Sequence, residues 1–333
     1  MTHITSKYIL SRLGYAAYNS ALIWSENRAI YITGLRVESE DPMILGHESS
    51  GIVHSVGKEV ESLKPGDRVA VEPGFPCRRC VYCKSGNYAL CPRLTFAATP
   101  PVDGTLQKYY LAPEDFCYKL PDHVTFEEGA LIEPLSVGVE ICKRGNVKGG
   151  DVVVIFGAGP IGLVVAAVAR AYGARKIISV DLVSSKLEYA KRFGGAEVFV
   201  PGKGTSEETA KQIIEKFSLG DGADVAIDAT GAEACIQTGI YVLKRAGRFV
   251  QAGMGKEMIS FPITTLISKG IVLVGSFRYS EGCYRESLRL VSDGIVDLKM
   301  MITHRFSFKE AVKAFETVKD GNDVLKVMIS GLE

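Results

Sequence analysis

The 333-residue chain balances 39 Lys and Arg against 38 Asp and Glu, and its 47% hydrophobic content is ordinary for a globular protein. At roughly 150 residues per domain this length corresponds to about two domains. The near-neutral charge argues against a basic nucleic-acid-binding protein or a polybasic membrane protein. No apolar run approaches the roughly 20 residues that a membrane-spanning helix needs. We therefore expect neither nucleic acid nor membrane as a partner.

The first 25 residues contain Lys7 and Arg12 but no acidic residue. Mitochondrial targeting peptides share this bias, although they are richer in arginine. The chain also has eight cysteines, of which four lie within residues 77–91 and none precedes Cys77. Such clustering indicates metal binding in a reducing compartment rather than an extracellular disulfide framework. We therefore expect a cytoplasmic protein, with mitochondrial targeting as a minor alternative.

Residues 41–121 are rich in Gly and Pro and contain short strand-forming runs, such as 51–53, 67–71 and 107–111. A turn signal, Pro65-Gly66-Asp67, stands beside one of these runs. Short strands joined by tight turns are typical of an all-β unit. This part of the sequence therefore predicts a compact β domain.

The pattern changes after Gly149, where strand-like and helix-like segments begin to alternate. The run 152–156 is continuously apolar, as in a parallel strand that is buried on both faces. Six strands separated by helices predict a doubly wound α/β sheet. The expected strands are 152–156, 176–180, 197–200, 224–229, 248–252 and 271–275, and the expected helices are 160–172, 184–192, 207–217 and 234–244. Beyond residue 277 we expect helices over 284–292 and 308–319 and a final strand over 325–329.

A glycine-rich turn links the first of these strands to its helix, with the sequence Gly157-Ala158-Gly159-Pro160-Ile161-Gly162. In a dinucleotide-binding turn the first glycine makes the bend, the second lets the backbone approach the pyrophosphate and the third lets helix pack on strand. Asp181 ends the second strand, where a carboxylate accepts hydrogen bonds from the adenosine ribose and repels a 2′-phosphate. The sequence therefore predicts NAD rather than NADP as the cofactor.

The cysteine cluster has the spacing Cys77-x2-Cys80-x2-Cys83-x7-Cys91. Four thiolates on one short loop can close a tetrahedral zinc site that has no open position, which makes the site structural. The alternative of four packed core thiols fits poorly, because the intervening residues include Arg78, Arg79, Lys84 and Asn87.

Several further motifs resemble those of the zinc-dependent medium-chain dehydrogenases. Residues 46–51, Gly-His-Glu-Ser-Ser-Gly, together with Gly57 and residues 65–69, are similar to the signature of that family. Residues 96–101, 133–138 and 277–279 are similar to its polyol branch, which contains sorbitol (L-iditol 2-), xylitol and L-arabinitol dehydrogenases. The match extends from about residue 41 to the C-terminus.

The resemblance implies a fold and an activity. The expected fold is α/β plus β: a GroES-like catalytic domain over 1–134 and 276–333, with its zinc lobe at 77–91, and a Rossmann NAD-binding domain over 135–275. The expected activity is NAD-linked, zinc-dependent oxidation of a polyol such as sorbitol or xylitol to the ketose. Arg278 and Tyr279 offer donors to polyol hydroxyls, which disfavours a simple alcohol as substrate. Members of the family are commonly homotetramers.

The resemblance also assigns roles to individual residues. His47 and Glu48 correspond to ligands of a catalytic zinc ion, and Glu133 to an acid beside it. The residues expected to line the polyol pocket are Phe96, Thr99, Glu133, Arg278 and Tyr279. Besides Gly157, Gly159 and Gly162, the residues expected to contact the cofactor are Ile161, Asp181, Lys186, Gly253, Met254, Gly255, Phe277, Arg278 and Tyr279.

Residues 1–40 depart from the family pattern. The family's third zinc ligand is a Cys in a Gly-x-Cys-Gly-Ser-Asp segment before Gly-His-Glu, and this segment is absent here. Loss of a soft thiolate should weaken the affinity for zinc, and loss of the opening strands should leave the β domain incomplete. Two interpretations follow: an ordinary enzyme with an altered first exon or gene model, or a paralogue that binds NAD and structural zinc with little or no catalysis.

Overall fold

The structure is a computed structural model that describes residues 8–18, 22–24, 29–32, 35–38, 42–321 and 323–331, the first four ranges by their backbone. Residues 1–7, 19–21 and 25 of the segment considered for targeting lie outside these ranges. The chain forms two compact units, Met1–Ser136 with Ser280–Glu333, and Val137–Tyr279. Among the described helices, none is both long and apolar enough to cross a membrane.

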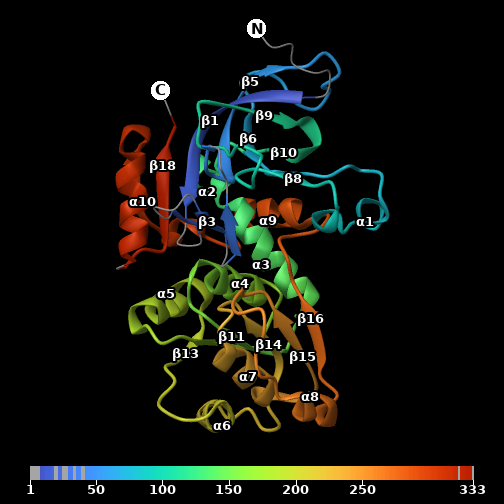
Figure 1. The fold of residues 1–333 in the computed structure, drawn as a ribbon, viewed down its shortest axis with the longest axis vertical. Helices are drawn as coiled ribbons and strands as arrows, with labels where there is room; N and C mark the ends of the chain where they lie inside the picture. The colour runs from blue at the N-terminus through green and yellow to red at the C-terminus, as the bar shows by residue number, and fades with distance from the viewer. Residues whose placement is uncertain are drawn as a thin grey trace. The chain divides into compact units, whose positions relative to one another are not determined.

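A seven-stranded sheet dominates the first unit, in the order β10-β6-β5-β1-β18-β17, with β9 also paired to β1. Strand β1 runs antiparallel to both β5 and β18. The sequence predicts an incomplete β domain, whereas β1 supplies an interior strand of this sheet (Figure 1). The bounds are β1 (Tyr8–Tyr18), β5 (Glu48–Val56), β6 (Arg68–Val71), β9 (Tyr109–Pro113), β10 (Cys117–Lys119), β17 (Ile302–Ser307) and β18 (Lys326–Ser330).

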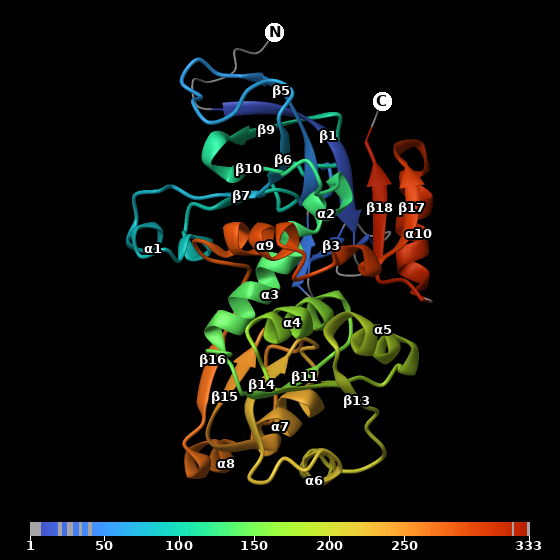
Figure 2. The same cartoon turned by 180° about the vertical axis from the view of Figure 1, so that it is seen from behind.

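Alternating residues bury one side of this sheet, as a period-two pattern requires. Val53, Val69 and Val71 pack with Ala112 and Tyr110 in one apolar cluster. The expected strand at 51–53 is confirmed within β5, and those at 67–71 and 107–111 are confirmed in β6 and β9, which begin one and two residues later than expected. Helix α10 (Ala311–Asp320) packs along β17 and β18, as Figure 2 shows.

Smaller elements complete the first unit. Strand β17 is not among the predicted strands, and the expected helix 308–319 starts as a 3-10 turn, η4 (Phe308–Glu310), before α10. Helix α3 begins in the first unit and ends in the second. The other bounds are β2 (Leu22–Trp24), β3 (Ala29–Ile32), β4 (Leu35–Glu38), β7 (Gly74–Phe75), β8 (Thr95–Phe96), α1 (Val81–Lys84), η1 (Tyr88–Leu90), η2 (Glu114–Phe116), α2 (Phe126–Ala130), α3 (Ile132–Arg144), α9 (Cys283–Ser292) and η3 (Leu298–Met301).

The second unit contains the predicted parallel sheet, in the order β13-β12-β11-β14-β15-β16. Figures 1 and 2 show α4 and α5 on one side of this sheet and α6, α7 and α8 on the other. The doubly wound prediction is therefore confirmed. The strands are β11 (Val152–Phe156), β12 (Lys176–Val180), β13 (Glu197–Phe199), β14 (Ala223–Asp228), β15 (Leu243–Gln251) and β16 (Val272–Gly275), and the helices are α4 (Pro160–Ala171), α5 (Ser184–Gly194), α6 (Ser206–Lys216), α7 (Glu233–Val242) and α8 (Ile263–Lys269).

The predicted boundary between the helix at 234–244 and the strand at 248–252 is wrong. The helix expected over 234–244 ends at Val242, and β15 begins at the next residue, Leu243. Leu243 is fully buried and pairs with Ala223 of β14. Residues that the helical pattern predicted as helix therefore belong to the sheet. Tertiary pairing overrides local propensity here.

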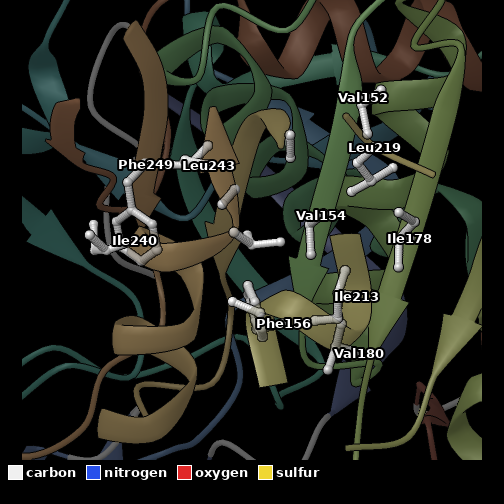
Figure 3. Packing of buried hydrophobic residues seen from close by; sticks show 14 of the residues in the cluster. Val152, Val154, Phe156, Ile178, Val180, Ile213, Leu219, Ile240, Leu243 and Phe249 are labelled. Carbon is white, nitrogen blue, oxygen red and sulfur yellow. The ribbon is translucent and has the colours of Figure 1, made fainter. Parts of the chain in front are cut away.

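The core beneath the nucleotide-binding turn is apolar throughout. Figure 3 shows Val152, Val154 and Phe156 of β11 beside Ile178 and Val180 of β12, and all five are buried. Full burial of one such side chain stabilises a fold by about 1.5–3 kcal/mol. The turn that follows Phe156 therefore starts from a rigid strand.

Candidate functional site

The glycine-rich turn after β11 has the close approaches that its sequence predicts. Gly157 has a φ of 99°, and a Cβ on Gly162 would lie 1.8 Å from the Gly157 carbonyl oxygen. A Cβ on Gly159 would meet no atom within 4 Å, so the backbone faces open space there. Gly159 precedes the first turn of α4, whose free N–H groups favour an anion. The turn therefore has the geometry of a pyrophosphate cradle.

Asp181 lies directly after β12 and beside this turn. One carboxylate oxygen accepts a hydrogen bond from the Ala158 N–H at 2.7 Å, and the other accepts from the Val183 N–H at 2.8 Å. The carboxylate is thus fixed in place by two backbone donors, while its side chain stays partly exposed. This position suits a ribose with two free hydroxyls and disfavours a 2′-phosphate.

The loops after β14 and β15 meet through glycines. A Cβ on Gly253 would lie 2.2 Å from the Gly231 nitrogen, and one on Gly255 would lie 1.9 Å from the Gly231 oxygen. Asp228, fully buried at the end of β14, accepts hydrogen bonds from the Gly231 N–H and from the Gln251 side chain. Sequence reasoning missed this organising role of Asp228, whose only signal is an acid at the end of a buried strand.

The other residues expected to contact the cofactor lie at several places in the second unit. Ile161 lies in the first turn of α4, Lys186 is half-buried on α5, and Met254 lies between the two glycines of the β15 loop. The Arg278 guanidinium stands over the Phe277 ring at 4.9 Å, with Arg278 itself at a φ of 53°. Tyr279 is buried.

The four lobe cysteines converge without disulfides. Their sulfur atoms lie within 4.8 Å of one another, with 3.4 Å between Cys80 and Cys83 and 3.8 Å between Cys77 and Cys83. Four sulfurs at about 2.3 Å from a tetrahedral zinc ion would be about 3.8 Å apart. The cysteine residues therefore fit a zinc ion.

Electrostatics in the lobe also favour a cation. The N–H groups of Arg79 and Cys80 donate to the Cys77 sulfur and lower the pKa of that thiol to about 5. Burial and the neighbouring sulfurs raise the pKa of Cys83 to about 12. Cys77 thus ionises readily and Cys83 does not, because clustered thiolates repel each other until a metal neutralises their charge.

A second cluster joins His47, Glu48 and Glu133. One donor atom from each lies within 4.8 Å of the others, and both carboxyl groups are buried. The loop before His47 is clamped by the Gly104 and Thr105 N–H groups, which donate to the Ile44 and Gly46 carbonyls at 2.7 Å. Glu133 comes from the first turn of α3. An imidazole and two carboxylates form a donor set that zinc accepts.

Glu48 already has a cationic partner. The Lys326 ammonium of β18 contacts both Glu48 carboxylate oxygens, one of them at 2.6 Å, and both side chains are buried. Burial raises the pKa of Glu48, and the Lys326 charge and hydrogen bond oppose that rise. Sequence reasoning missed Lys326, although a lone lysine within the apolar run 324–329 is an unusual residue that could have drawn notice.

Phe96 lies against the first member of this cluster. Its ring centroid is 5.6 Å from that of His47, at an interplanar angle of 54°. Gly74 leaves room for the ring, because a Cβ there would approach Phe96 Cδ2 to 2.9 Å. Thr99 follows in the next turn and is half-buried. The Phe96 ring thus lies beside His47, where it limits the access of water to the imidazole.

Comparison with known proteins adds a family context. Residues 20–122 match the family model of the alcohol dehydrogenase GroES-like domain, and residues 160–293 match that of the zinc-binding dehydrogenases. D-xylulose reductase A of Aspergillus niger is 52% identical over 294 residues, which cover 88% of this chain and 82% of that protein. The probable D-xylulose reductase A of Aspergillus terreus is also 52% identical over 294 residues, 88% of this chain and 83% of its own.

Solved structures agree with these matches. An Escherichia coli oxidoreductase of unknown specificity superposes with a TM-score of 0.87 at 31% identity, covering 98% of this chain and 93% of that one. L-idonate 5-dehydrogenase of Escherichia coli superposes with a TM-score of 0.86 at 25% identity, covering 98% and 91%. The expected combination of a GroES-like domain with a Rossmann sheet is confirmed.

Proposed function

This chain belongs to the zinc-dependent medium-chain dehydrogenases of the polyol branch, and on that basis we propose that it interconverts a polyol and its ketose with NAD as the hydride carrier. The observation that carries the proposal is the convergence of His47, Glu48 and Glu133 within 4.8 Å. These are the residues that the family motif assigns to catalysis. The cradle after β11 and the Asp181 carboxylate support NAD as the cofactor.

The proposed substrate pair is xylitol and D-xylulose, with sorbitol as a second polyol of the same chemistry. Its support is the name of the relatives that are 52% identical, which are D-xylulose reductases. Arg278 and Tyr279 are proposed to donate hydrogen bonds to substrate hydroxyls beside the reacting carbon. Phe96 and Thr99 are proposed to contact the substrate as well.

The roles of the protein residues follow from their chemistry. When bound, zinc makes the substrate hydroxyl more acidic and stabilises the developing negative charge. His47, Glu48 and Glu133 would hold it, and Cys77, Cys80, Cys83 and Cys91 would hold the structural zinc ion. A buried carboxylate such as Glu133 can also accept the hydroxyl proton and pass it on.

A second candidate function is a non-catalytic paralogue that binds NAD and structural zinc. Two observations favour it: the chain has no cysteine before Cys77, and Lys326 already neutralises Glu48. A site of one imidazole and two carboxylates, one of them shared with an ammonium, binds zinc more weakly than a site with a thiolate.

We also propose a homo-oligomer, a tetramer by analogy with the family, and a cytoplasmic location. The oligomer is supported by β16, the outermost strand of the parallel sheet, where Val272 and Leu273 are 41% and 48% exposed. An exposed apolar edge strand is suited to pairing with a second copy. Light scattering of the purified protein tests this proposal.

One experiment separates the two candidate functions. Zinc content per chain and xylitol-dependent NADH formation are measured for the wild type, for His47→Ala and for the control His54→Ala, whose exposed imidazole packs on Tyr109 of the sheet surface. For an active enzyme we expect two zinc ions per chain, one for each cluster. His47→Ala should then lose one of them and at least ~100-fold in turnover, whereas His54→Ala should keep both. One zinc ion, NAD binding and no turnover with xylitol or sorbitol would overturn the enzyme proposal in favour of the paralogue.

A further inference from the structure

A buried carboxyl group connects the cysteine lobe to the main sheet of the first unit. Glu72 follows β6 and is fully buried. One of its oxygens accepts a short hydrogen bond from the Tyr88 hydroxyl, and the other accepts from the Tyr118 hydroxyl at 2.8 Å. Tyr88 belongs to the lobe, between Cys83 and Cys91, and Tyr118 belongs to β10. The carboxyl group therefore bridges two parts of the unit.

Other contacts also join the lobe to the rest of the first unit. Arg78 forms two hydrogen bonds with Asp115, at 2.7 and 2.9 Å, but both side chains are about half exposed. The Glu281 N–H donates to the Gly86 carbonyl at 2.9 Å. The Tyr88 ring meets Phe116 edge-on at 5.9 Å. Of these polar contacts, the bond between Tyr88 and Glu72 is the one shielded from water.

The same network reaches the strand that carries Glu48. The Tyr118 ring stacks on Tyr284 of α9 at 5.1 Å, and the Tyr284 hydroxyl donates to the Val71 carbonyl at 3.0 Å. Val71 pairs with Ser49, the residue after Glu48 in β5. A change in how Glu72 is bonded would therefore act on both sides: on the lobe through Tyr88, and on β5 through Val71.

We propose that Glu72 is a buried, protonatable anchor that fastens the cysteine lobe to the sheet, so that the lobe is held tightly when the carboxyl group is neutral and loosens when it ionises. Neither the activity nor the zinc sites require such a device. The inference rests on the lobe being the zinc-binding element of the proposed function, but its test does not depend on turnover.

The direction of the pH effect follows from the surroundings of Glu72. Burial is the largest influence and raises the pKa of Glu72 to about 7, against the two tyrosine hydrogen bonds, which lower it. Glu281 and Asp115 add negative charge nearby and raise it further. Detachment of the lobe would admit water to the carboxyl group and lower its pKa towards the ordinary value of 4.5. Attachment is therefore strongest below that value, weakens as the pH rises towards 7, and is constant above it.

Hydrogen–deuterium exchange over residues 77–91 tests this pH dependence of lobe attachment. The zinc content of each sample is measured beforehand. The wild type is compared with Glu72→Gln, whose amide keeps a donor and an acceptor but cannot ionise. The wild-type exchange rate divided by that of Glu72→Gln should rise about tenfold between roughly pH 5.5 and roughly pH 8, because intrinsic exchange cancels in the ratio. A ratio that stays constant with pH would overturn the proposal.

Two further variants keep the test decisive if Glu72→Gln does not fold. Tyr118→Phe and Tyr88→Phe each remove a donor that stabilises the carboxylate, so each should move the midpoint of lobe loosening to higher pH. Tyr82→Phe, in α1 of the same lobe with its ring 45% exposed, is the matched control and should leave the midpoint unchanged. Faster exchange with an unchanged midpoint in both Tyr88→Phe and Tyr118→Phe would show an effect of packing alone and would contradict the anchor. Loss of polyol turnover with the pH-dependent ratio intact would count against the proposed function only.

Discussion

The two metal-ligand clusters of the first unit are built in opposite ways. The lobe collects four sulfur donors from residues 77–91, on one loop that contains the short helix α1 and the 3-10 turn η1. The other cluster takes one imidazole and two carboxylates from residues as far apart as His47 and Glu133, and it shares Glu48 with Lys326. The first site is a property of a short segment, whereas the second exists only after the whole unit has folded.

Their donors differ as well as their origin. Four thiolates make a soft, closed set that binds zinc strongly and leaves no position for substrate. Nitrogen and oxygen donors bind more weakly, and here the metal must compete with a buried ammonium for one carboxylate. We expect the lobe to keep its metal under conditions in which the His47 cluster loses it.

The largest effect should come from removing a lobe thiolate. Cys91 is the buried member of the set, and its sulfur accepts hydrogen bonds from the Cys77 and Arg93 N–H groups. Cys91→Ser should release one zinc ion per chain and lower the free energy of unfolding by on the order of 4 kcal/mol, because zinc binding and lobe folding are coupled. Metal analysis and calorimetry measure both quantities.

Cys235→Ser is the control for this variant, since Cys235 lies in α7 of the second unit and outside both clusters. It should retain all zinc and change the stability by less than about 1 kcal/mol. If both variants lost the same amount of stability, the stability of the lobe would not depend on its zinc ion, and the prediction would be wrong.

A smaller loss is expected at the second cluster. Lys326→Met leaves the Glu48 carboxylate buried without its cation, which should cost about 3 kcal/mol in the zinc-free protein. Added zinc should then stabilise this variant more than the wild type, because the ion supplies the missing positive charge. Urea unfolding with and without zinc measures the difference. Lys119→Met, which breaks the half-exposed pair with Asp67 in the same unit, should show no such zinc dependence.

The smallest effect belongs to the surface of the lobe. Arg78 pairs with Asp115 and stands over the Phe116 ring at 5.3 Å, but it is about half exposed. Arg78→Gln should cost about 0.5–1 kcal/mol and less in high salt. Arg245→Gln breaks an exposed pair with Asp221 whose guanidinium has no aromatic ring over it among the described residues, and it should cost less still. Urea unfolding of both variants at low and high ionic strength checks the order, and a larger loss for Arg245→Gln would reverse it.

What could be predicted from the sequence was whatever short segments specify by themselves. The spacing of Cys77 to Cys91 and the Gly157 turn each depend on neighbouring residues, and the structure has both geometries. The alternation of strands and helices in the second unit is equally local, and it is confirmed except where β15 takes Leu243 from the expected helix.

Long-range pairings could not be read in the same way. Lys326 meets Glu48 across 278 residues, and Glu72 meets tyrosines 16 and 46 residues away. The residues next to Glu48 and Glu72 in the sequence do not indicate these partners, because each contact depends on which strands and loops become neighbours in the fold. Strand β1 is a further example, since residues 8–18 match no family motif and yet run between β5 and β18.

The place of β1 has a consequence for biosynthesis. Its antiparallel neighbour β18 is translated only after Val137–Tyr279, so the sheet of the first unit stays unfinished while that segment is made. At about 5–20 residues per second that delay is on the order of ten seconds. The second unit is a continuous segment that can fold once it is translated, whereas the edge of β1 that later pairs with β18 is open to premature association until β18 is made.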